Sequence, residues 1–361
     1  SCVQAKFTRA VPTSTGWDGN YKWIRRANIM VDRIDSRMKD ILSAEEYSHW
    51  MGIARLYRGL EFARLVNTYG DVPYYDHVVK TSDLDDLYKD RTPRNEVMDN
   101  VYDDFEYALA NIRLNDGAQN INRYVAAALV SRWALYEGSW QKYYYNNPSQ
   151  ATKFFNLAVA AGDIVMNSGR FDITLDFRSL FGSNCNVSES RSVGPNLSLI
   201  KSFVCVDGKD WQTSSVENSK DFSLANLIKT RDSRFEASFY HKPTVKSKSC
   251  YLYPVKFIPR SALKYLEVKG GAPDVEYTSV NNLNGYPVLR YAEVLLNWIE
   301  AKAELSTLGA GSVTQEDIDL SVNKIRNRPL AQEAVERGVQ KTAPMELAAL
   351  PDDPSRDSDV P

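Results

Sequence analysis

The feature that most constrains this chain is a set of long, periodically apolar segments that each run into a glycine. The segment "EEYSHWMGIARLYRGLEFARLVNTYG" ends at Gly70, and Pro73 follows closely. Glycine readily adopts the left-handed conformation that ends a helix, and proline cannot continue one. The pattern therefore predicts a mainly α-helical chain. Three later segments are expected to end in the same way, at Gly138, Gly169 and Gly309.

Capping residues stand at the starts of these segments. Ser43, with Glu46 three positions later, has the form of a capping box, in which two side chains satisfy free amides of the first turn. Thr92 is expected to cap a later helix, with Pro93 in its first turn. A helix is also expected over 21–42, where apolar residues recur every three to four positions. Two more caps are expected at Asn122 and Thr314.

Three of the segments resemble one another. "GIARLYRGLEFARLVNTYGD", "YVAAALVSRWALYEGSW" and "RYAEVLLNWIEAKAELSTLG" share a small-residue start and a similar spacing of large side chains, and a second amphipathic segment follows each. Repeated helix pairs of this size are typical of tetratricopeptide-like stacking. The expected fold is mainly α, a tetratricopeptide-like helix-pair scaffold with a loop-rich, partly β insertion.

Composition divides the chain into four parts. Residues 1–170 form the N-terminal helical part. In 171–285 glycine, serine, asparagine and proline rise and short alternating pieces such as "YLYPVKFIP" appear, so we expect a variable, loop-rich ligand-binding insertion. The last helix pair, 286–330, is expected to pack on the N-terminal part. Residues 331–361 are polar and Pro-rich at their end and are expected to form a poorly ordered tail.

Charge and hydropathy argue against two kinds of interaction. The 361 residues carry a formal net charge of −2, and no run of Lys or Arg exceeds two residues, so nothing indicates nucleic-acid binding. No apolar run approaches the ~18–20 residues that a membrane helix needs. No signal peptide is visible, and we expect a mature or trimmed form of the chain.

Three glutamates share one face of an apolar segment. Glu293, Glu300 and Glu304 fall within a stripe about 40° wide on a helix. A pair of carboxylates cleaves a glycosidic bond only across a sugar-sized cleft, and a helix face is not a cleft. We interpret the stripe as a polar seam that meets solvent or a neighbouring arginine. Since G-x-S-x-G, H-E-x-x-H and a phosphate-binding glycine loop are also absent, the sequence predicts no catalytic residues and no enzyme activity.

Metal and redox chemistry find little support. The cysteines follow no zinc or redox spacing, and both a disulfide among Cys185, Cys205 and Cys250 and free thiols stay open. Asp207 and Asp210 in "DGKD" are interpreted as turn residues. We expect no metal site and no cofactor. The histidines are expected to be structural or surface residues: His49, His77 and His241.

Aromatic residues in loops are the candidates for ligand binding. The chain has 21 Tyr, 13 Phe and 7 Trp. An exposed ring can stack on the apolar face of a sugar while amides bond to its hydroxyls, although core packing stays an alternative for each residue. Trp17 and Tyr21, four apart at a helix start, are instead expected to be structural. The candidates are Trp211, Trp140, Tyr143, Tyr144, Tyr145, Tyr277, Asn281, Asn282 and Tyr286, with Trp140 placed just beyond the expected helix end.

Blocks of the chain resemble one protein family in a fixed order. They are "NYKWIRRANIMVDRI", "RLYRGLEFARLVNTYGDVPYY", "TPRNEVMDNVYDDFEYALANI", "NRYVAAALVSRWALYEGSW", "DGKDW" with "RDSRF", and "YPVLRYAEVLLNWIEAKAEL". Together they span about residues 17–330 and resemble the SusD/RagB family of outer-membrane nutrient-binding lipoproteins. The "YGDVP" and "LRYAEVLL" blocks are the most specific of them.

The resemblance implies a non-enzymatic protein of polysaccharide utilisation, exposed on the cell surface at the outer membrane. Members capture an oligosaccharide or polysaccharide and deliver it to a TonB-dependent SusC-like transporter, whereas RagB-like members bind peptides. The resemblance also implies an N-terminal lipid anchor. That anchor is not evident in this chain, because Cys2 stands unusually close to the first family block. The family's binding loops vary, so it supplies no fixed ligand residues.

Overall fold

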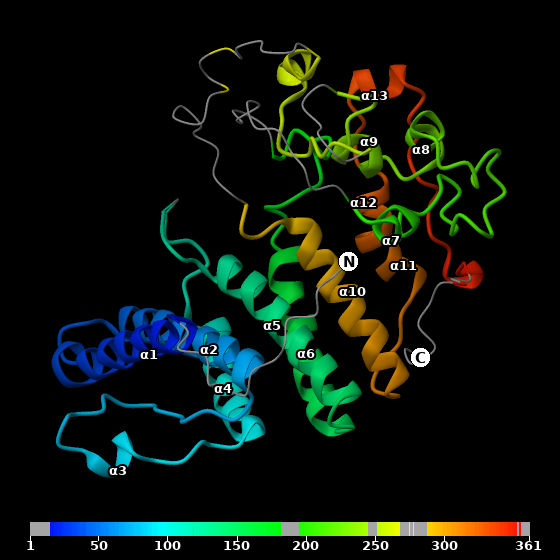
Figure 1. Ribbon diagram of the computed structural model, residues 1–361. Coiled ribbons are helices and arrows are strands. Elements are labelled where there is room, and N and C mark those ends of the chain that lie inside the picture. Colours follow the sequence, from blue (N-terminus) through cyan, green and yellow to red (C-terminus); the bar gives the residue numbers. More distant parts are fainter. Residues whose placement is uncertain are drawn as a thin grey trace, which may run out of the picture. The chain divides into compact units, whose positions relative to one another are not determined.

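The computed structural model describes residues 15–117, 119–181, 195–244, 251–267, 274, 277, 287–351 and 354. These residues form helices joined by loops (Figure 1), and their β pairing is limited to isolated bridges. The expected mainly α-helical fold is confirmed. The chain divides into two compact units, Ser1–Asn167 and Ser168–Pro361. Apart from the expected tail, which is described below, the finer division into four parts stays a prediction.

The first unit is a series of packed helices. α1 packs on α2, α2 on α4, α4 on α5, and α5 on α6, which lies beside it in Figure 1. Helices paired with their neighbours in the chain are what the tetratricopeptide-like pattern predicts. The elements are α1 (Thr15–Arg33), the π-helical turn η1 (Ile34–Met38), α2 (Ala44–Tyr69), α3 (Leu84–Leu87), α4 (Arg94–Asn111), α5 (Arg123–Tyr143) and α6 (Pro148–Met166).

The start and end of α2 follow the sequence prediction. The Ser43 hydroxyl accepts a hydrogen bond from the Glu46 amide at 3.2 Å, and the Glu46 carboxylate accepts one from the Ser43 amide at 3.0 Å. This reciprocal pair is the expected capping box. Gly70 ends the helix with a φ of 71°, a conformation that favours glycine.

α5 differs from its prediction, because it passes through Gly138 and continues to Tyr143. Gly138 is buried against Phe155 of α6, and a Cβ atom on it would lie 2.6 Å from that ring. The glycine therefore allows two helices to approach closely and does not end one. The expected helix end was wrong, and Trp140 lies inside α5 and not in a loop. The other two predicted glycines do follow helix ends with positive φ, at Gly169 and Gly309.

Thr92 also has a different role from the one predicted. α4 begins at Arg94, with Pro93 in the N-cap position. Thr92 instead forms an antiparallel bridge with Val72, in which each amide donates to the other's carbonyl, at 3.1 and 3.3 Å. The first residues of α4 are thus tied to the segment that leaves α2. The remaining two caps are confirmed, at Asn122 and Thr314.

The second unit combines one long helix with short ones. Around 238–240 and 253–255 the chain pairs briefly through two backbone hydrogen bonds of 2.8 and 2.9 Å, so the β part of the expected insertion is small within the described residues. The elements are α7 (Leu197–Lys201), α8 (Leu224–Thr230), α9 (Arg234–Ser238), η2 (Arg260–Leu266), α10 (Tyr291–Thr307), α11 (Gln315–Ile318), η5 (Asp319–Asn323), α12 (Lys324–Arg326), α13 (Gln332–Glu336) and η6 (Leu347–Ala349).

Residues 331–349 are packed into the second unit, which contradicts the expected poorly ordered tail for this stretch. Ala334 and Val339 are buried in one apolar cluster with Phe235. The Thr342 hydroxyl donates to the buried Asp232 carboxylate at 2.6 Å. The apolar residues of this stretch are too few to show a period in the sequence, yet Ala334 and Val339 are both part of the core.

Candidate functional site

Three rings on the last turns of α5 stack on one another. Tyr136, Trp140 and Tyr144, here called the aromatic ladder, are spaced four residues apart and so share one helix face. The ring centroids of Tyr136 and Trp140 are 6.0 Å apart and those of Trp140 and Tyr144 are 4.4 Å apart, with interplanar angles of 26° and 23°. Trp140 therefore stacks on both tyrosines. Tyr144 is 75% exposed, which leaves its outer face to solvent.

Two more tyrosines complete this exposed group. Tyr143 is the last residue of α5, and Tyr145 follows the C-cap. Their exposed fractions are 40% and 47%. The structure thus brings together four sequence-predicted residues, Trp140 and Tyr143 to Tyr145. Sequence reasoning missed Tyr136, although its spacing of four from Trp140 would have indicated it had α5 been extended past Gly138.

A buried ion pair lies directly beneath the ladder. The Arg94 guanidinium donates to both carboxylate oxygens of Glu137, at 2.7 and 2.5 Å, and both residues are under 5% exposed. The Arg94 guanidinium carbon also lies 5.1 Å from the Trp140 ring and 5.4 Å from the Tyr145 ring. A bidentate pair has fixed geometry. The rings therefore rest on a rigid base that joins α4 to α5.

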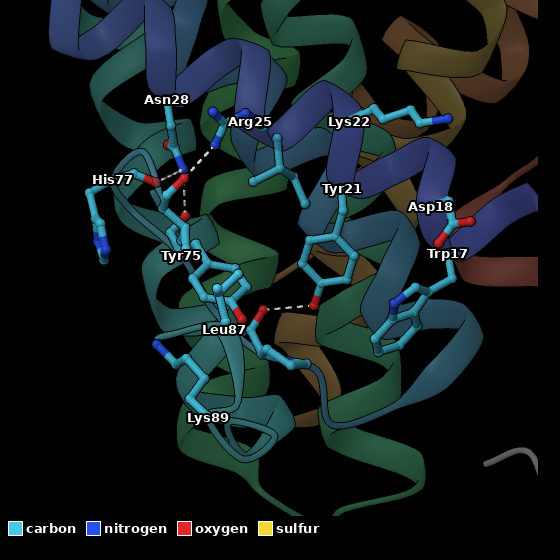
Figure 2. A pocket seen from close by; sticks show the side chains of 13 residues that line it. Trp17, Asp18, Tyr21, Lys22, Arg25, Asn28, Tyr75, His77, Leu87 and Lys89 are labelled. Atoms are coloured by element: carbon cyan, nitrogen blue, oxygen red, sulfur yellow. Dashed lines mark hydrogen bonds between the residues drawn. The ribbon is translucent and has the colours of Figure 1, made fainter. Parts of the chain in front are cut away.

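A second candidate feature is a cavity of about 530 Å³ between α1 and residues 71–93, which we call the strap. Figure 2 shows the rings of Trp17, Tyr21 and Tyr75 at this cavity. Trp17 and Tyr21 are 5.1 Å apart, as their spacing of four predicted. Sequence reasoning treated both as structural and did not predict that they would line a cavity.

Most polar groups of this cavity bind the strap itself. The Tyr21 hydroxyl donates to the Pro73 carbonyl at 2.7 Å, and the Asn28 amide donates to the Tyr75 and His77 carbonyls at 2.9 and 3.0 Å (Figure 2). Burial, and then the nearby Tyr75, raise the pKa of Tyr21, so its hydroxyl keeps the proton that it donates. These bonds hold the wall in place and leave few polar groups for a ligand.

His77 links two acidic residues of the strap. Its Nδ1 lies 2.8 Å from the Asp76 carboxylate and its Nε2 lies 2.8 Å from the Asp86 carboxylate. These two hydrogen bonds raise the pKa of His77. The imidazole therefore fastens the first part of the strap to α3.

The other predicted ligand residues are less accessible. Trp211 is half-buried and packs edge-on against Phe222, with ring centroids 5.1 Å apart. Tyr277 is 6% exposed in an apolar cluster, with its hydroxyl 2.9 Å from that of Ser261. We leave Tyr277 out of the candidate site, because neither face of its ring is open. Three predicted residues lie outside the described ones: Asn281, Asn282 and Tyr286.

The glutamate stripe lies beside arginines, as its interpretation as a polar seam requires. Glu293 and Glu300 line a cavity of about 410 Å³ together with Arg234, Arg290 and Arg328. This cavity has no opposed carboxylates from a second element among the described residues that line it. The stripe thus has neighbours suited to a structural role.

The structure also describes the predicted turn at Asp207 and one of the four cysteines. Asp207 accepts hydrogen bonds from the Lys209 and Ser215 amides, and Gly208 has a φ of 79°, which confirms the turn. Cys205 is a free, buried thiol. Within the described part of the chain, no three His, Cys, Asp or Glu side chains gather as metal ligands would. The other cysteines lie outside that part: Cys2, Cys185 and Cys250.

Comparison with known families decides the classification. Residues 3–135 match a family described as SusD-like, starch-binding and associating with the outer membrane. Residues 165–343 match the SusD/RagB profile, described as the SusD family. The chain belongs to the SusD/RagB family. The family resemblance expected from the ordered sequence blocks is confirmed.

Two curated SusD/RagB relatives come from Formosa agariphila. SusD-like protein P2 is 27% identical over 301 residues, which cover 75% of this chain and 54% of P2. SusD-like protein P25 is 27% identical over 131 residues, which cover 36% of this chain and 24% of P25. The chain thus spans about half the length of P2 and a smaller share of P25.

Solved SusD/RagB structures share the fold. A SusD-like carbohydrate-binding protein of Bacteroides fragilis superposes with a TM-score of 0.60 at 18% identity, covering 91% of this chain and 66% of that one. A SusD superfamily protein of Parabacteroides distasonis gives 0.54 at 18% identity, covering 90% and 69%. None of the helices formed by the described residues combines the length and apolar character needed to span a membrane.

Proposed function

We propose that this chain captures an oligosaccharide or polysaccharide at the cell surface without cleaving it. Membership of the SusD/RagB family supports this function, and the open face of Tyr144 is the observation that carries it. The apolar face of a sugar ring packs well on an exposed aromatic ring. Trp140 supports Tyr144 from behind through their 4.4 Å stacking.

Polar groups for sugar hydroxyls stand next to this ring. Tyr143 and Tyr145 flank Tyr144 and expose 40% and 47% of their surface. Asn146 is exposed. Its side-chain amide makes no hydrogen bond to any described residue. An amide offers both a donor and an acceptor to a ring of hydroxyls. The group at the end of α5 therefore combines one stacking surface with several polar ends.

We also propose delivery of the captured glycan to a TonB-dependent SusC-like transporter at the outer membrane, with attachment through an N-terminal lipid anchor. The family match supports this proposal. Co-purification with a TonB-dependent barrel, after mild detergent extraction of outer membranes, tests it. Recovery of the protein without any such barrel would contradict the proposed partner.

Calorimetric titration of the purified chain against a panel of soluble glycans tests capture. The Tyr144→Ala variant should bind its glycan about two- to tenfold more weakly, because one aromatic stacking contact contributes roughly 0.5–1.5 kcal/mol. Tyr88→Ala is the matched control, since Tyr88 is 83% exposed and lies outside the ladder. Binding of peptides together with silence for every glycan would replace this proposal by a RagB-like peptide-binding function.

Absence of catalysis is tested on the same samples. Incubation with the bound glycan should release no shorter sugars. Hydrolysis products that disappear in a Glu300→Gln variant would instead show that the glutamate stripe is catalytic.

A further inference from the structure

A cavity in the second unit is lined by aromatic rings and cations. Its volume is about 670 Å³, and we call it the Phe177 cavity. The only charged side chains among the described residues that line it are Lys256 and Arg234, and no carboxylate does so. The rings that line it are Phe177, Phe203, Phe239 and Phe257.

Among the described residues, no carboxylate lies beside the Lys256 ammonium in this cavity. Its Nζ lies 4.4 Å from the centroid of Phe181 and 5.1 Å from that of Phe177. No carboxylate among the described residues forms an ion pair with it. Arg234 uses its Nε for an ion pair with Asp232 at 2.6 Å, and its two terminal nitrogens make no hydrogen bond within the described part. Both cations can therefore accept an anionic partner.

Two more arginines add positive charge next to this cavity. The guanidinium carbons of Arg290 and Arg328 each lie 5.8 Å from the Phe177 centroid. Arg328 is 5% exposed, and its buried Nε has no hydrogen-bond partner in the described chain. Arg290 is the N-cap of α10, whose 17 residues place the positive end of the helix dipole there.

The acidic side chains near this cavity lie next to other cations or line the adjoining cavity. Asp176 lies 3.7 Å from Arg260. Glu293 and Glu300 line the adjoining cavity, which shares Phe177 and Arg234 with this one. They offset part of the arginine charge there, but they do not line the Phe177 cavity.

The cations also act on one another. Burial, and then the positive charge of Arg290, lower the pKa of Lys256. Burial, and then Arg290 and Arg234, lower the pKa of Arg328. Each direction shows that the charged form of the side chain is disfavoured in this setting. A bound anion would relieve this repulsion.

We propose that the Phe177 cavity binds an anionic sugar unit, one that carries a carboxylate or a sulfate ester. The apolar face of the sugar would pack on a phenylalanine ring while its anionic group meets Lys256 and Arg234. This inference rests on the proposed glycan-binding function and adds the chemical class of the glycan.

Calorimetry with matched ligands tests the inference. Tetragalacturonate, its methyl ester and a sulfated carrageenan tetrasaccharide differ in the kind and presence of charge. At least one charged ligand should bind about tenfold more tightly than the uncharged ester, since charged hydrogen bonds contribute on that order. The preference should weaken as sodium chloride rises.

Variants assign the preference to this cavity. Lys256→Met should remove it, Lys256→Arg should restore most of it, and Lys264→Met is the control because Lys264 also lies over a ring, 4.9 Å from the Tyr265 centroid. Equal binding of charged and uncharged ligands would overturn the anionic class and leave glycan capture standing. A preference unchanged in Lys256→Met would overturn the assignment to this cavity. Silence for every glycan would overturn the proposed function as well.

Discussion

Cationic side chains lie against aromatic rings in both units, but they differ in whether a carboxylate of the described residues pairs with the charge. In the first unit Arg94 lies 5.1 Å from the Trp140 ring and is paired with Glu137 through two short hydrogen bonds. In the second unit Lys256 lies 4.4 Å from the Phe181 ring and has no carboxylate partner among the described residues. The first cation is part of the framework, whereas the second is open to a ligand.

The difference teaches how to separate a structural cation from a binding one. A buried charge needs a partner, since the cost of removing it from water is otherwise not offset. Arg94 meets that need within the chain. Lys256 meets it only in part, through the faces of Phe177 and Phe181. Proximity to aromatic rings alone would not have distinguished the two cases.

The largest expected effect comes from breaking the matched pair. Glu137→Gln leaves the Arg94 charge buried without a carboxylate, and we expect the free energy of unfolding to fall by about 3–5 kcal/mol. Urea denaturation of the full chain measures this. Glu96→Gln on the exposed surface of α4 is the control and should change little. A loss for Glu137→Gln as small as that of the control would show that the pair is not structural.

The packing beneath the ladder gives the next largest effect. Gly138→Ala places a Cβ atom against Phe155, and overpacking of this kind costs about 1–3 kcal/mol. Gly19→Ala in α1 meets no atom within 4 Å and should be neutral or stabilising by up to about 1 kcal/mol. Comparison of the two unfolding curves checks the prediction, and equal effects would contradict it.

Lys256 should differ from Arg94 in its contribution to the free energy of unfolding. Lys256→Met removes a charge that lacks a partner and keeps most of the side chain's contacts with the rings. We expect the free energy of unfolding without ligand to change by no more than about 0.5 kcal/mol. A large loss would place Lys256 with Arg94 among the structural cations and would erase the distinction between the units.

The smallest effect concerns His77, whose positive charge depends on pH. Its hydrogen bonds to Asp76 and Asp86 raise the pKa of His77 in the folded chain above the value of about 6.5 in the unfolded chain. The stabilising contribution is therefore complete below pH 6.5 and is lost as pH rises through the folded pKa. The effect is small, because half of the side chain is exposed to solvent. Hydrogen-exchange protection factors of strap amides, which are corrected for the base-catalysed rise of the intrinsic exchange rate, should fall over this range, and His77→Gln should abolish the fall.

Local signals in the sequence predicted several ends of the long helices, among them both ends of α2. The capping boxes at Ser43 and Thr314 involve side chains three residues apart, so their partners are visible in the sequence. Gly138 misled the prediction because its partner is Phe155, on the following helix. A glycine required by close packing looks the same in a sequence as a glycine that ends a helix.

The candidate sites were predicted to the extent that they are local. Trp140 and Tyr143 to Tyr145 are neighbours in the chain, and the structure gathers them. The Phe177 cavity joins residues from four separate stretches of the second unit, which include Phe177, Arg234 and Lys256. No spacing rule brings such residues together, because their proximity follows from the packing of loops.

The stacked rings of the ladder have a consequence for the entropy of binding. Each side chain that a ligand must immobilise costs about 0.5–1.5 kcal/mol in lost rotational freedom. Tyr144 is already held against Trp140, so a sugar would find its stacking surface in place. Replacing Trp140 by leucine would therefore weaken binding mainly through entropy, although Trp140 itself need not touch the ligand.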